Sequence, residues 1–102
     1  MPKENQEPGP GRATKTATKE KVKSQQLPPY KVILHNDDVN DMQYVVLAIM
    51  ELVHLPKKEA EQRMWEAHTT GVTMLIVTHK ERAELLAEQF ASKRLTASIE
   101  PA

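Results

Sequence analysis

Apolar residues are distributed very unevenly along this chain of 102 residues. Residues 1–27 contain only five of them, together with six basic and three acidic side chains. Such a segment cannot bury enough apolar surface to offset the entropy lost on ordering, so we expect residues 1–28 to form a flexible, disordered extension. The following 75 residues hold 35 apolar side chains, enough for one small core, and we predict a single domain over residues 29–102.

The composition excludes several classes of protein. There is no cysteine, which removes disulfide frameworks, thiol nucleophiles and Cys-ligated zinc. The longest apolar run, residues 44–50, is far shorter than the ~18 residues of a membrane span, and the N-terminus lacks the apolar region of a secretory signal. Basic and acidic residues are equal at 14 each, which argues against nucleic acid as the partner. We therefore expect a cytoplasmic protein that binds neither membrane nor nucleic acid.

The hydrophobic periodicity of residues 29–102 predicts three strands and three helices. The strands are expected at residues 30–34, 72–77 and 95–99, and the helices at about 40–53, 56–69 and 78–90. The order β-α-α-β-α-β indicates an α+β domain, in which three amphipathic helices cover one face of a three-stranded, mainly antiparallel sheet.

Helix-capping signals mark the expected helix ends. Asn40 and Thr78 are predicted N-caps, each with Gln or Glu three residues later to close a capping box. Val39 and Tyr44 have the spacing of a hydrophobic staple around the first of these caps. Pro56 suits the first turn of the second helix, and Gly71 is its expected C-terminal stop.

A polar run, His35-Asn36-Asp37-Asp38, lies between the first strand and the first helix. If the extended backbone persists, Asn36 and Asp38 point to one side and His35 and Asp37 to the other. His68 follows Met64 by one turn on the apolar face of the second helix. These acceptors near apolar side chains suit a ligand with a positive donor head and an apolar body, such as a free protein N-terminus with a large first residue.

Three other interpretations remain open. Asn-Asp-Asp before a helix is commonly turn chemistry alone, a single His on an apolar face is commonly a core residue, and methionines commonly fill cores. A metal-dependent hydrolase would use His35, Asp37, Asp38 and His68, although no H-E-x-x-H signature is present. A protein–protein module with an inert pocket is the third alternative.

The run Tyr-Lys-Val-Ile-Leu-His-Asn-Asp-Asp at residues 30–38 resembles the ClpS family, adaptors of the Clp ATP-dependent protease. The likeness continues through Met42, Tyr44-Val45-Val46, Met64, Ala67-His68 and Gly71, and covers most of residues 29–102. It implies a β-α-α-β-α-β core behind a flexible N-terminal extension, with no catalytic activity and no cofactor. It also implies that the protein binds N-end-rule substrates that begin with Leu, Phe, Tyr or Trp, and passes them to a ClpA or ClpC unfoldase that feeds ClpP.

The resemblance also implies residue roles. Asn36, Asp38 and His68 would hold the α-amino group, with Asp37 nearby. The side-chain pocket would be lined by Met42, Val45, Met64, Ala67 and Leu95, with Met42 as a gate against residues branched at Cβ. Glu81 and Glu84 match the surface that docks on the unfoldase.

The sequence departs from the family pattern at three places. Asn40 stands where many members have Thr, and Leu86 stands where they have a basic residue. The short connection from Phe90 to Leu95 resembles the plastid and cyanobacterial branch of the family.

Overall fold

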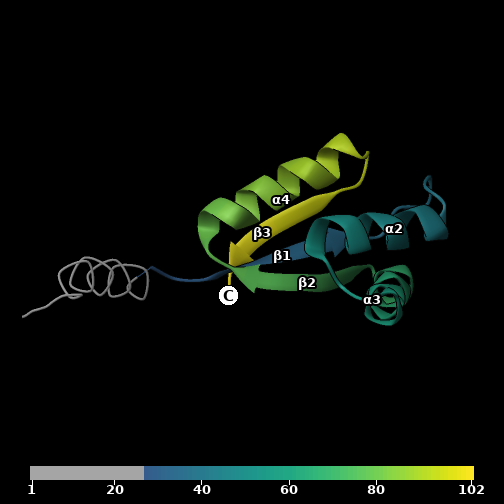
Figure 1. The fold of residues 1–102 in the computed structure, drawn as a ribbon, viewed down its shortest axis with the longest axis horizontal. Coiled ribbons are helices and arrows are strands. Elements are labelled where there is room, and N and C mark those ends of the chain that lie inside the picture. The colour runs from purple at the N-terminus through teal and green to yellow at the C-terminus, as the bar shows by residue number, and fades with distance from the viewer. Residues whose placement is uncertain (1–26) are drawn as a thin grey trace, which may run out of the picture.

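Three strands form one antiparallel sheet in the computed structural model, which describes residues 27–102. The central strand β1 (Tyr30–His35) pairs with β2 (Val72–Thr78) on one side and with β3 (Ala97–Pro101) on the other. Helices α2 (Met42–Val53), α3 (Lys57–Thr70) and α4 (Lys80–Ser92) pack on one face of this sheet, with α3 beside α2 and near β2 (Figure 1). The predicted element order and α+β class are confirmed, while the expected extension lies almost wholly outside the described residues.

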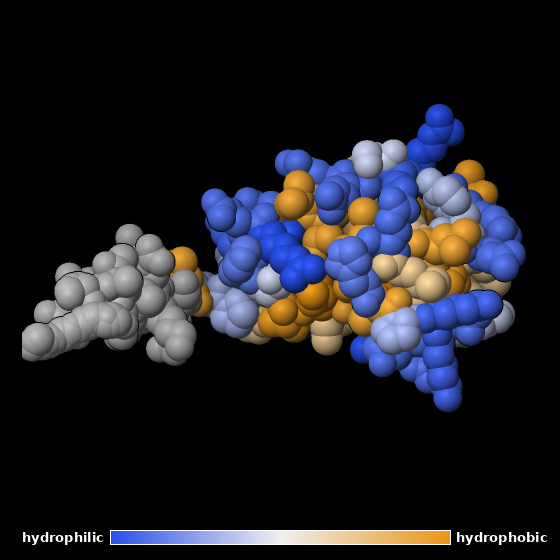
Figure 2. All heavy atoms as spheres, viewed as in Figure 1, coloured by the Kyte–Doolittle hydropathy of each residue, from blue (hydrophilic) through white to orange (hydrophobic). Residues whose placement is uncertain are grey.

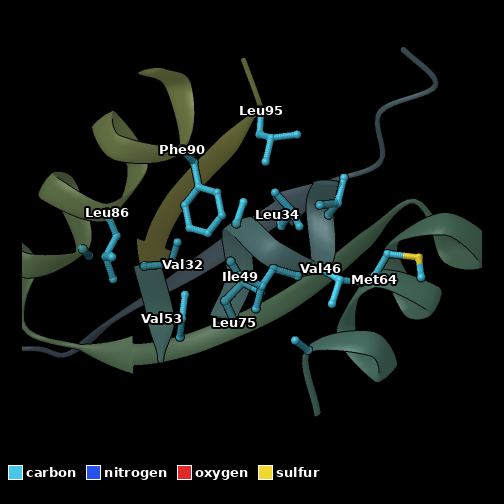
Figure 3. Close-up of a cluster of buried hydrophobic side chains, with 14 residues drawn as sticks. Val32, Leu34, Val46, Ile49, Val53, Met64, Leu75, Leu86, Phe90 and Leu95 are labelled. Atoms are coloured by element: carbon cyan, nitrogen blue, oxygen red, sulfur yellow. The ribbon is translucent and has the colours of Figure 1, made fainter. Parts of the chain in front are cut away.

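The core is formed where the buried face of the sheet meets the helices (Figure 3). Alternate side chains of β1, Val32 and Leu34, point into it, as the period-2 geometry of a strand requires. Val46 and Ile49 of α2 and Phe90 of α4 pack against them. Burial of each large side chain contributes about 1.5–3 kcal/mol, so these residues hold β1, α2 and α4 together around the site.

The predicted capping of the first helix is wrong. Asp41, not Asn40, is the N-cap of α2, and its side chain makes no capping hydrogen bond. The Asn40 amide is already engaged, because it donates to Asp37 Oδ2 at 2.6 Å and to the Arg94 carbonyl oxygen at 2.9 Å. Val39 is 91% exposed, so it forms no hydrophobic staple.

The other two helices also differ from the predictions at their starts. His79 is the N-cap of α4 and its Nδ1 accepts a hydrogen bond from the Arg82 N–H, because Thr78 remains in β2 opposite Tyr30. Pro56 is the N-cap of α3 rather than its first helical residue. The end of α3 is as expected: Gly71 has a left-handed backbone (φ 99°) and closes the last turn.

The connection between α4 and β3 is a tight turn. Arg94 adopts a left-handed backbone conformation (φ 65°), and the Leu95 N–H returns to the Phe90 carbonyl oxygen at 3.0 Å. Strand β3 consequently begins at Ala97, two residues later than predicted. Leu95 lies outside the strand but is still buried, at 3% exposure.

Within residues 27–102, no helix has the length and apolar character needed to cross a bilayer.

Candidate functional site

A small pocket lies where the end of β1, the start of α2, the second half of α3 and the α4–β3 connection meet. Its polar lining consists of His35, Asn36, Asp37, Asn40 and His68. Its apolar lining consists of Leu34, Met42, Val45, Met64, Ala67 and Leu95. The structure thus brings together all of the residues named for this site from the sequence except Asp38. It adds Leu34, His35 and Asn40, which the sequence analysis did not assign to the pocket.

The Asp37 carboxylate organises the loop that enters α2. Its Oδ1 accepts the Val39 N–H at 2.7 Å and the Asn40 N–H at 3.3 Å, and its Oδ2 accepts the Asn40 side-chain amide. These bonds, the Val39 N–H first, hold the pKa of Asp37 below its ordinary value of 3.8 against the opposing effect of burial. Asp37 therefore places a negative charge at the pocket at neutral pH.

Asn36 connects this loop to the end of α3. Its backbone N–H donates to the Gly71 carbonyl oxygen at 2.9 Å, and its side-chain Nδ2 donates to Asp38 Oδ1 at 3.2 Å. Within residues 27–102 no hydrogen bond reaches the side-chain carbonyl oxygen of Asn36, which is left as an acceptor. Asp38 is exposed and lies outside the pocket lining. Extended structure ends at His35, so strand alternation does not govern these side chains.

His68 contributes an imidazole from the last turns of α3. The ring is exposed, and it packs edge-on against Trp65 with 5.7 Å between ring centroids. No hydrogen bond to the His68 ring is found in the described part of the chain, so a neutral imidazole offers a free acceptor nitrogen. Trp65 was not identified from the sequence, because its place beside His68 depends on the side-chain packing of α3.

Two long-range hydrogen bonds bring the last wall of the pocket into place. The Asn40 amide donates to the Arg94 carbonyl oxygen, and the Tyr44 hydroxyl donates to the Lys93 carbonyl oxygen at 2.9 Å. Together they fasten the α4–β3 connection to the start of α2. Leu95 follows directly and lines the pocket.

The pocket is nearly filled by its own side chains. Its free volume is about 20 Å³, room for about one water molecule. A Leu or Phe side chain therefore requires the lining to move. Met42 and Met64 are the residues suited to that motion, because an unbranched thioether side chain changes rotamer easily.

The geometry gives no support to the metal-dependent hydrolase. Within residues 27–102 no three His, Asp or Glu side chains are grouped so that they could bind a metal ion. His35, one of the four ligands considered, instead has its Nε2 2.8 Å from the Ser98 hydroxyl.

The first turns of α4 carry an acidic exposed face. Glu81 and Glu84 are both exposed, and Leu85 beside them is 52% exposed. Leu86, which departs from the family pattern, is only 3% exposed. An apolar residue at that position therefore belongs to the core and not to the acidic face.

Comparison with known proteins shows one consistent family. The family model described as ATP-dependent Clp protease adaptor protein ClpS matches residues 25–98. An ATP-dependent Clp protease adapter protein ClpS from Synechococcus elongatus is 45% identical over 87 residues, which cover 84% of this chain and 87% of that protein. The chloroplastic CLPS1 of Chlamydomonas reinhardtii is 40% identical over 81 residues, 78% of this chain and 50% of that protein.

A solved structure agrees with this result. Agrobacterium tumefaciens ClpS2 bound to L-phenylalaninamide superposes with a TM-score of 0.70 at 25% sequence identity. The match covers 74% of this chain and 98% of the solved one. The ligand of that relative has a free α-amino group and an aromatic side chain.

Proposed function

Because the chain belongs to the ClpS family of ATP-dependent Clp protease adaptor proteins, we propose that its pocket binds the first residue of substrate proteins. The ligand is a free α-amino group followed by a Leu, Phe, Tyr or Trp side chain. The bound substrate is delivered to a Clp unfoldase of the ClpA or ClpC type, and ClpP performs the proteolysis. The relatives include chloroplastic proteins, and the cytoplasmic location stays a prediction.

One observation carries the proposal: anionic and neutral acceptors share a single pocket with apolar walls. At pH 7 an α-amino group is mostly an ammonium with three donors, since its reference pKa is ~7.7–8.0. The Asp37 carboxylate, the Asn36 side-chain carbonyl oxygen and a neutral His68 nitrogen offer one acceptor for each donor. The direct contact expected for Asp38 remains a prediction, and its bond to Asn36 also suits an orienting role.

Both halves of the ligand are needed for useful affinity. A charge-assisted hydrogen bond contributes roughly 1.5–3 kcal/mol, and burial of a Leu or Phe side chain contributes about the same. After the cost of immobilising the peptide, we expect micromolar binding, about −8 kcal/mol.

A pair of matched peptides tests the proposal. We expect a fluorescent peptide that begins with Leu to bind in an anisotropy titration, while its N-acetylated twin does not, because acetylation removes the charge and two donors. A peptide that begins with Ala should bind weakly, since Ala leaves the apolar walls unfilled. Equal binding of the free and acetylated peptides would show that the ammonium is not recognised.

The acidic face of α4 is the proposed contact with the unfoldase. Reversing the charge of Glu81 or Glu84 to Lys should weaken binding to a ClpA or ClpC unfoldase without changing peptide affinity. Glu59→Lys is the matched control, because Glu59 is equally a helix-surface acid but lies on α3. If the control weakens unfoldase binding as much, the effect reflects net charge and not this surface.

A further inference from the structure

An open apolar groove lies between α2 and α3, directly beside the pocket. Its free volume is about 360 Å³, and Met42 and Met64 line both hollows. Leu47 and Trp65 form much of its exposed lining, at 59% and 51% exposure. Apolar atoms correspondingly reach the surface over α2 (Figure 2).

The groove extends one to two helical turns beyond the methionines that it shares with the pocket. On α3 the pocket uses Met64, Ala67 and His68, whereas the groove continues toward the helix start through Glu61 to Lys57. On α2 the groove continues toward the helix end, to Met50. One helical turn rises ~5.4 Å. In an extended peptide, residues 1 and 3 point to the same side and lie ~6.5–7 Å apart, a spacing that places the third side chain within the first two helical turns of the groove.

We propose that this groove binds an apolar side chain at the third position of the peptide whose first residue occupies the pocket. The inference rests on the proposed function, since the pocket sets the starting point and direction of the bound chain. The groove is continuous with the pocket through two shared methionines, so a chain leaving the pocket along α2 and α3 crosses it. The second side chain points away into solvent.

The chemistry of the groove selects apolar over charged side chains. Val46 and Leu47 of α2 face Trp65 of α3, and these three present no charge. The two charged members, Lys57 and Glu61, are one helical turn apart and opposite in sign, so the lining carries no net charge. Because the groove is open to solvent, it removes only part of a bound side chain from water. We therefore expect about a three- to tenfold gain in affinity for an apolar third residue.

Matched peptides and two matched variants test the assignment. The peptides all have a free N-terminal Leu and carry Leu or Ser at position 2 and Leu or Ser at position 3. The variants are Leu47→Ser, in the groove, and Leu85→Ser, an equally exposed leucine on α4. Dissociation constants are measured by fluorescence anisotropy, and the Ala-initiated and N-acetylated peptides are included in every series.

We expect the wild-type protein to prefer Leu over Ser at position 3 of the peptide. The Leu47→Ser variant should lose this preference and the Leu85→Ser variant should keep it. In both variants the preference for Leu over Ala at position 1 should be unchanged. Equal affinities for Leu and Ser at position 3, with first-residue selectivity intact, overturn the groove assignment and leave the proposed function standing. A preference at position 2 alone, or a Leu47→Ser defect only in unfoldase binding, also overturns it. If the wild-type protein shows no preference for Leu over Ala at position 1, both the proposed function and the groove assignment are refuted.

Discussion

Replacement of Asp37 separates the two roles that the structure gives this side chain. The carboxylate accepts three hydrogen bonds that shape the turn before α2, and it also supplies the negative charge of the pocket. Asp37→Ala removes both functions. Asp37→Asn keeps an acceptor oxygen for the Val39 N–H, bound at 2.7 Å, but removes the charge.

The two variants should therefore differ in stability and agree in binding. Loss of a comparable capping contact costs ~1 kcal/mol, which lowers the Tm of a domain of this size by ~4–8 °C. We expect that drop for Asp37→Ala and a smaller one for Asp37→Asn. Peptide affinity should fall in both, by roughly 10- to 150-fold, because one charge-assisted bond of about 1.5–3 kcal/mol is lost.

Thermal unfolding followed by circular dichroism and anisotropy titration with a Leu-initiated peptide provide the two measurements. Asp41→Asn is the matched control, because Asp41 is exposed, makes no capping hydrogen bond and lies outside the pocket lining. The reasoning is refuted if Asp37→Asn binds as tightly as the wild type, since the charge then has no role. If Asp38→Asn alone abolishes binding at an unchanged Tm, Asp38 is the direct partner of the ammonium.

Three further predictions concern the gate, a helix end and pH. Met42→Ala should enlarge the pocket and raise the affinity of Ile- and Val-initiated peptides relative to that of Leu-initiated peptides. An unchanged affinity ratio in anisotropy titrations argues against Met42 as a gate. Gly71→Ala should cost ~1 kcal/mol and lower the Tm by ~4–8 °C: the left-handed φ of 99° disfavours a side chain, although an added Cβ has nothing within 4 Å. An undiminished Tm contradicts this. The folded-state pKa of Asp37 is lowered, so its charge stabilises the folded protein in full above the ordinary value of 3.8, and this contribution disappears as pH falls through the folded pKa. A carboxyl-carbon NMR titration of Asp37 should have its midpoint below 3.8, and a midpoint at or above that value disproves the effect.

Local sequence signals were sufficient to predict the helices and strands, but not the residues at which the helices begin. The apolar stripe of α2 and the alternation of β1 follow from burial of one face, which a period of 3.6 or 2 records directly. The N-caps were placed wrongly because Asn40 and Thr78 had competing partners: a side-chain network in one case and a strand pairing in the other. Two of these partners, Arg94 for Asn40 and Tyr30 for Thr78, lie far outside a window of ten residues, so local patterns do not reveal them.

The order of the elements, the fold class and most of the residues around the pocket follow from the sequence alone, through residue type, spacing and family resemblance. Only the tertiary structure decided that Asp37 and not Asp38 lines it, that Leu95 completes it, and that an open groove continues from it. The reason is the range of the interactions involved. Asn40 and Arg94 are 54 residues apart, and Tyr44 and Lys93 are 49 apart, so no local pattern encodes the contacts that fasten the α4–β3 connection to α2.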